Sequence, residues 1–156
     1  MLDYQLLPSE DHIVRYCNPK LKTESGRVSE AAFELREIDL RKKPSYLSVN
    51  WIEYYQSFAE AFEEIKKIWI EKKLNKPGSQ IALLNVGHTI NYVRDASISD
   101  GSIRKCIDLI IKKTDSNDKN PSHSGIFGYE EFNKQICSRI YSNKFLSFNK
   151  AIRPRQ

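Results

Sequence analysis

One segment limits what this chain can fold into more than any other: a capped amphipathic helix in the middle of the sequence. Ser57 is a favourable N-cap residue, and Glu60 three positions later completes a capping box. Pro77 and Gly78 end the helical pattern, so we expect a helix over about 58–73. Its apolar side chains recur at helical spacing, at Phe58, Ala61, Phe62, Ile65, Ile68 and Trp69. A stripe of this kind has to be buried against another element, and the flanking sequence favours a sheet.

The flanking segments show strand patterns. Residues 12–17 are predicted to form a short strand that ends before Pro19. Apolar and polar residues alternate in 32–36 and 46–51, as they do in half-buried strands. The apolar run 80–86 is typical of a buried central strand, which we expect Gly87 to end.

The rest of the chain gives weaker signals. Residues 88–96 fit either a helix or a strand, and so do 103–113, where the β-branched content favours a strand. Residues 115–128 are predicted to form a long polar loop, about 129–143 a final amphipathic helix, and 144–156 a basic tail that frays.

These elements predict one small α+β domain over residues 1–143, followed by the basic tail. The 156 residues suit a single domain, and 40% hydrophobic content suffices for one core. We expect a mostly antiparallel or mixed sheet with two main helices covering one of its faces.

Charge and cysteine content bear on partners and compartment. Lys plus Arg number 25 against 20 Asp plus Glu, a net charge of +5, which favours an anionic partner slightly because the basic residues are spread along the chain. Cys17, Cys106 and Cys137 are an odd set without a C-x-x-C pair, so a cytoplasmic protein without a disulfide framework is expected. No leader pattern or apolar run near the ~20 residues of a membrane span is present, so no membrane association is expected.

The stretch 120–128 is the most specific candidate for a site. It places small polar residues and glycines just before the predicted final helix, where backbone N–H groups can bind an anion. Ser122, Ser124 and Gly125 are candidate binding residues, and His123 a candidate proton donor or ligand. The alternative is a structural loop in which His123 is bonded to a carbonyl.

His12 and Arg15 are candidate catalytic partners of His123. On a regular strand their side chains point to opposite faces, so only a bend would bring His12 and Arg15 together. Asp11 and Glu53 are the nearest acidic candidates.

The sequence also bears on an ADP-ribosyltransferase-like site and on metal, phosphate-loop and esterase sites. Arg15, Ser48 and Glu53 fit an ADP-ribosyltransferase-like order, although many sequences satisfy that spacing. The histidines and cysteines show no zinc spacing, and neither a phosphate-binding glycine loop nor a G-x-S-x-G motif is present. We therefore expect no metal and no cofactor.

An aromatic group follows the third predicted strand. Trp51, Tyr54 and Tyr55 precede the helix, and Trp and Tyr are common in binding hot spots. They are candidate residues for docking a partner, with core packing as the alternative.

Three stretches, 32–36, 46–53 and 120–126, resemble a family of short uncharacterised bacterial proteins found near mobile and conflict-related genes. The resemblance implies a bacterial or phage source and a role in defence or toxin systems. It implies no known activity and identifies no catalytic residue.

Three hypotheses follow from the sequence. The first is a non-catalytic accessory module that docks onto a larger protein. The second is a small enzyme acting on a phosphate-containing substrate through His123 with Arg15 or His12. The third is a protein that binds nucleic acid directly.

Overall fold

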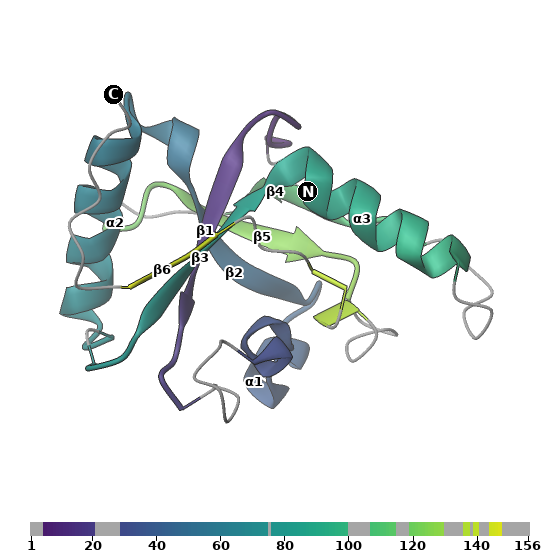
Figure 1. Ribbon diagram of the computed structural model, residues 1–156, viewed down its shortest axis with the longest axis horizontal. Coiled ribbons are helices and arrows are strands. Elements are labelled where there is room, and N and C mark those ends of the chain that lie inside the picture. Colours follow the sequence, from purple (N-terminus) through teal and green to yellow (C-terminus); the bar gives the residue numbers. More distant parts are fainter. Residues whose placement is uncertain are drawn as a thin grey trace.

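The chain folds around one six-stranded antiparallel sheet (Figure 1). The computed structural model describes residues 5–20, 29–74, 76–99, 107–114, 119–129, 136–137, 139–140 and 144–147, with 98–99 and 144–147 described for the backbone alone. The strand order is β4-β5-β2-β1-β3-β6, and every neighbouring pair is antiparallel. The strands are β1 His12–Cys17, β2 Tyr46–Trp51, β3 Gln80–Asn85, β4 Ile110–Lys113, β5 His123–Phe127 and β6 Lys144–Ser147. The predicted α+β class is confirmed.

Two long helices accompany three short helical turns. The long helices are α2 Phe58–Glu71 and α3 Val86–Ser99. The short ones are η1 Glu30–Phe33, α1 Glu37–Leu40 and η2 Ile52–Tyr54. Within the described ranges, none of these helices has the length and apolar character that crossing a bilayer demands.

The helix α2 forms as the sequence predicts. Ser57 Oγ accepts a hydrogen bond from the backbone N–H of Glu60 at 3.1 Å, and Glu60 in turn accepts one from Gln56 N–H at 3.1 Å. Phe62 and Ile65 on the apolar stripe are 3% and 0% exposed, which confirms that the stripe faces the sheet.

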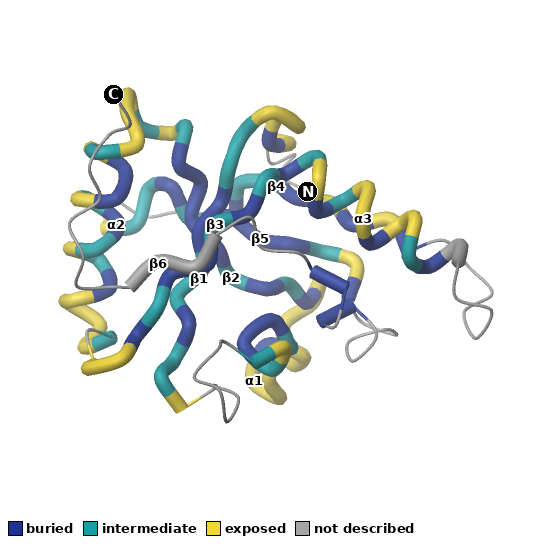
Figure 2. Tube along the Cα trace, viewed as in Figure 1, coloured by how far each residue is buried: buried dark blue, intermediate teal, exposed yellow. Residues whose placement is uncertain are grey.

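The two long helices lie on opposite faces of the sheet (Figures 1 and 2). The second covering helix that the sequence predicts, 129–143, lies mostly outside the described residues. On one face, Phe62 and Ile65 of α2 join Val14 and Ile81 in one core cluster. On the other, Val93 of α3 belongs to a second cluster with side chains of the strands. The reason is that β1 and β3 carry apolar residues at successive positions, so both of their faces need a cover.

Residues 32–36 do not form the expected strand. They begin in η1, whose N-terminus is capped by Ser29 Oγ, and continue into a bend before α1. Phe33 and Leu35 are nevertheless buried, at 4% and 3% exposure. Alternating apolar residues predicted their burial correctly but not their backbone conformation.

The strand β3 runs directly into α3, so Gly87 does not end an element. It is the second residue of a helix that includes the ambiguous residues 88–96. Asn85 Oδ1 accepts a hydrogen bond from His88 N–H at 2.8 Å and so helps to begin the helix. For 103–113, the strand interpretation is confirmed at Ile110–Lys113, and residues 101–106 lie outside the described part.

Two predictions near the C-terminus are wrong. The expected loop 115–128 contains β5, which pairs with both β2 and β4. The first residues of the expected tail, Lys144–Ser147, form β6 and pair with β3. Most of the predicted helix over 129–143 lies outside the described residues, as does the tail from 148 onward.

Candidate functional site

The most distinctive surface is the half of one sheet face formed by β2, β5 and β4. The strand β2 pairs with β5 so that Tyr46, Ser48 and Asn50 lie opposite Phe127, Gly125 and His123, respectively. The residues between them, Leu47, Val49 and Ile126, belong to the core cluster on the α3 side of the sheet. The core cluster beneath α2 draws on β1, β3, η2 and α2, and it includes no residue of β2, β4 or β5. Among the described residues, this half-face is therefore mostly polar and aromatic, with the exposed Ile110 opposite Phe127, and none of its side chains joins the core cluster beneath α2.

Three rings lie side by side on this half-face. The Tyr46 ring centroid is 4.9 Å from that of Phe127 and 5.9 Å from that of His123. Tyr46 lies across Gly125, because a Cβ built on this glycine would stand only 2.7 Å from Tyr46 Cδ2. All three ring residues are partly exposed. We call Phe127, Tyr46 and His123 the aromatic row.

Two lysines extend over the aromatic row. Lys42 Nζ lies 5.0 Å from the centre of the Tyr46 ring, and Lys112 Nζ lies 4.7 Å from the centre of the Phe127 ring. Both distances are those of cation–π contacts. The row thus combines flat aromatic faces with positive charge.

His123 is held neutral at ordinary pH. Burial, and then the positive charges of Lys72 and Lys42, lower its pKa from 6.5 to about 4. The Nδ1 atom is hydrogen bonded to Thr114 Oγ1 on the neighbouring chain segment. The threonine hydroxyl also donates to the carbonyl oxygen of His123 at 3.1 Å.

A buried polar network fixes the start of β5. Asn50 Nδ2 donates to Asn120 Oδ1 at 2.6 Å and to Ser122 Oγ at 3.0 Å, and Tyr55 Oη donates to Ser122 Oγ at 3.2 Å. Ser124 is fully buried and donates to the Ser122 carbonyl at 3.1 Å. These contacts give Ser122 and Ser124 a structural role in the fold.

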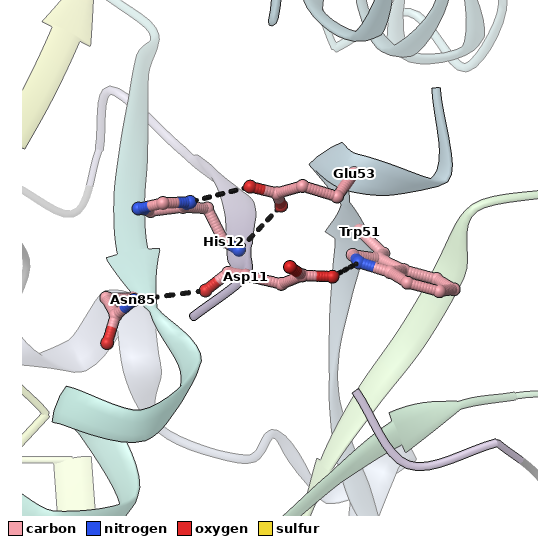
Figure 3. A network of polar contacts seen from close by, with 5 residues as sticks. All are labelled: Asp11, His12, Trp51, Glu53 and Asn85. Atoms are coloured by element: carbon pink, nitrogen blue, oxygen red, sulfur yellow. Dashed lines mark hydrogen bonds and ion pairs between the residues drawn. The ribbon is translucent and has the colours of Figure 1, made fainter. Parts of the chain in front are cut away.

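A second polar cluster lies where β1 begins (Figure 3). His12 binds Glu53 twice, through its backbone N–H and through ring Nδ1, each at 2.7 Å. The Trp51 indole N–H donates to the Asp11 carboxylate at 2.8 Å, and Asn85 Nδ2 donates to the Asp11 carbonyl at 3.2 Å. Glu53 is thus the acidic partner of His12, as expected, whereas the Asp11 carboxylate binds Trp51.

Arg15 is partly buried, and its guanidinium is directed at main-chain carbonyls. Its Nε donates to the Ala32 carbonyl at 2.6 Å and its Nη1 to the Ser48 carbonyl at 2.8 Å. Burial lowers its pKa, an effect that nearby Tyr129 partly offsets. Because it ties η1 to the sheet, Arg15 serves as an internal cross-link.

The three predicted catalytic residues do not meet through any contact between described residues. His12 pairs with Glu53, Arg15 binds main-chain carbonyls, and His123 binds Thr114 across the sheet. The ADP-ribosyltransferase-like arrangement is not formed either, since Ser48 offers Arg15 its carbonyl oxygen, not its hydroxyl.

The predicted docking aromatics differ in exposure. Trp51 is buried at 8% exposure, and Tyr55 is partly buried with its hydroxyl bonded to Ser122. Tyr54 is 44% exposed, with Lys113 Nζ 5.3 Å from its ring centre. Only Tyr54 of these three offers substantial surface to a partner.

The main residues that sequence reasoning missed are Tyr46, Phe127, Lys42 and Lys112. The sequence contains one sign of this surface: Tyr46, Ser48 and Asn50 lie together on the polar side of the predicted strand 46–51. The sequence of the neighbouring strand β5 predicts a loop, so no sequence pattern places Phe127 and His123 beside Tyr46. Across the described ranges, no three His, Cys, Asp or Glu side chains gather closely enough to hold a metal ion.

Fold and site together define a small antiparallel α+β domain with an aromatic, lysine-flanked half-face. No protein-family model matches the sequence, and neither the curated proteins nor the solved structures contain a significant match.

Proposed function

We propose that this protein is a non-catalytic binding module for single-stranded nucleic acid, and that the aromatic row is its binding surface. The observation that supports this most directly is the pair of lysine ammonium groups, 5.0 Å and 4.7 Å from the centres of the Tyr46 and Phe127 rings.

The chemistry of this surface suits a polymer with flat bases and regularly spaced phosphates. Unpaired bases stack on aromatic side chains, and lysines beside the rings pair with the phosphates that follow. A base that stacks on Tyr46 or Phe127 would displace Lys42 or Lys112 from the ring without moving it far from the ligand. The net charge of +5 acts in the same direction over a longer range.

The other two hypotheses have less support from the contacts. An enzyme using His123 with His12 or Arg15 would need these side chains to converge, and the contacts described above direct them to different partners. Docking onto a larger protein would use exposed apolar surface, which at the predicted site is limited to Tyr54. The bacterial, cytoplasmic and defence-related setting stays a prediction from the sequence.

The test is a titration of fluorescently labelled single strands of about ten nucleotides, followed by anisotropy at about 50 and about 200 mM salt. We expect affinity to fall as salt rises, through counterion release. Lys42→Ala and Lys112→Ala should each weaken binding and reduce the log–log salt slope by about 1.

Lys67→Ala is the matched control. Lys67 lies on α2 and pairs with Glu64 at 3.2 Å, so its loss should leave the salt slope unchanged. Absence of binding to any strand, or equal effects of all three substitutions, would contradict the proposal.

A further inference from the structure

The Thr114 hydroxyl lies within hydrogen-bonding distance of two atoms of His123, the carbonyl oxygen at 3.1 Å and ring Nδ1. Its single proton can go to the carbonyl oxygen, which can only accept. In that arrangement Thr114 Oγ1 accepts a hydrogen bond from Nδ1–H. In a neutral imidazole this leaves Nε2 with a lone pair.

No hydrogen bond joins Nε2 to any residue in the described part of the chain, and the His123 side chain is partly exposed next to Tyr46. With a pKa lowered to about 4, the ring stays a neutral acceptor throughout the physiological range.

Building on the proposed function, we infer that His123 Nε2 accepts a hydrogen bond from the exocyclic amino group of a base stacked on Tyr46. The protein then prefers adenine and cytosine to thymine and uracil. The amino groups of adenine and cytosine project from the base edge, whereas the ring N–H of thymine or uracil lies between two carbonyl oxygens that repel a lone pair.

The test compares oligo(dA) with the same strand in which adenine is replaced by purine, which lacks the amino group but keeps the ring and the phosphates. Wild-type protein should bind the purine strand roughly two- to tenfold more weakly, the effect of one neutral hydrogen bond. His123→Phe, which keeps a ring and removes the acceptor, should bind both strands equally.

Thr114 is a positioning residue in this scheme and supplies a second pair of variants. Thr114→Ser keeps the hydroxyl and should keep the adenine-over-purine preference, whereas Thr114→Val should reduce it. If His123→Phe fails to fold, the comparison of Thr114→Ser with Thr114→Val still tests whether the preference depends on this histidine.

The outcomes separate the two proposals. Binding to both strands with equal affinity by the wild type, or an equal preference in His123→Phe, overturns the inference and leaves the proposed function standing. Failure to bind any strand overturns the proposed function, and the inference falls with it.

Discussion

The Tyr46 ring lies over Gly125 on the next strand, with Cδ2 only 2.7 Å from where a Cβ on Gly125 would stand. Residues 46 and 125 are not direct cross-strand partners, since Tyr46 pairs with Phe127 and Gly125 with Ser48. The ring reaches diagonally over the glycine and so comes within 5.9 Å of His123. The absence of a side chain at Gly125 is what allows the aromatic row to form.

Gly125→Ala should therefore displace the Tyr46 ring. We expect a loss of about 1–3 kcal/mol in the free energy of unfolding, the usual result of overpacking, together with weaker binding of single strands. Urea unfolding and anisotropy measure the two effects. Gly87→Ala is the control, because its Cβ would also be crowded, at 2.8 Å from Ser9 Cβ, but in α3. It should lower stability with little change in the affinity of the folded protein.

Tyr46→Leu should remove a stacking surface while leaving an apolar side chain on Gly125. Because stacking on an aromatic ring contributes about 1–3 kcal/mol per base, affinity should fall by roughly five- to a hundredfold. Tyr92→Leu is the comparison, since Tyr92 is 46% exposed in α3 and lies beside His88. Equal losses in the two variants would argue against the aromatic row as the binding surface.

Stability should fall in acid because of His123. Its pKa is about 4 in the folded protein and near 6.5 when unfolded, so between these values the unfolded state binds the extra proton. Stability from this group is complete above about pH 6.5, declines as the pH falls toward 4, and then levels off. The total is roughly 1–3 kcal/mol, allowing for the partial exposure of the ring.

Unfolding free energies measured by urea at pH 7 and pH 4.5 test this effect. His123→Phe should show a smaller difference between the two pH values than the wild type. An equal decrease in unfolding free energy between pH 7 and pH 4.5 in the two proteins would contradict a lowered pKa for His123.

Glu53 should contribute to stability through its two bonds with His12, each 2.7 Å long. Glu53→Ala removes both, and we expect a loss of about 1–2 kcal/mol, reduced by the partial exposure of the pair. Glu53→Gln keeps an acceptor for the backbone N–H and should cost less. Glu63→Ala, in an exposed pair with Lys67, should change stability by no more than about 0.5 kcal/mol.

Much of the central architecture could be predicted from the sequence. The capped stripe after Ser57 and the patterns of 12–17, 46–51 and 80–86 each indicate one element, and α2, β1, β2 and β3 form there. The local sequence pattern could not show that α3 covers the face opposite α2, because this depends on which side chains of β1 and β3 point toward each face of the sheet.

The elements that were missed are those held by long-range pairing. The sequence of β5, His-Ser-Gly-Ile-Phe, has the small and polar residues of a loop, yet it pairs with a strand on each side. A central position in a sheet overrides weak intrinsic strand preference. The same holds for Lys144–Ser147, where basic residues suggested a tail but the backbone pairs with β3.

Only part of the candidate site could be predicted from the sequence, for the same reason. His123 and Gly125 were selected because they were thought to precede a helix, and they belong instead to a strand beside Tyr46. Glu53 could be named as an acidic candidate for His12, because His12 begins one predicted strand and Glu53 follows the end of another. The convergence of Tyr46 with Phe127 required the register between β2 and β5, which no local pattern contains.

The most direct test of the account is a backbone amide chemical-shift map of the wild-type protein titrated with a single-stranded oligonucleotide. The account predicts that the largest shifts fall on β2, β5 and β4, around Tyr46, Gly125 and Lys112, with little change along α3. Shifts centred on α3 or on the His12–Glu53 pair, or no shifts at saturating oligonucleotide, would contradict it.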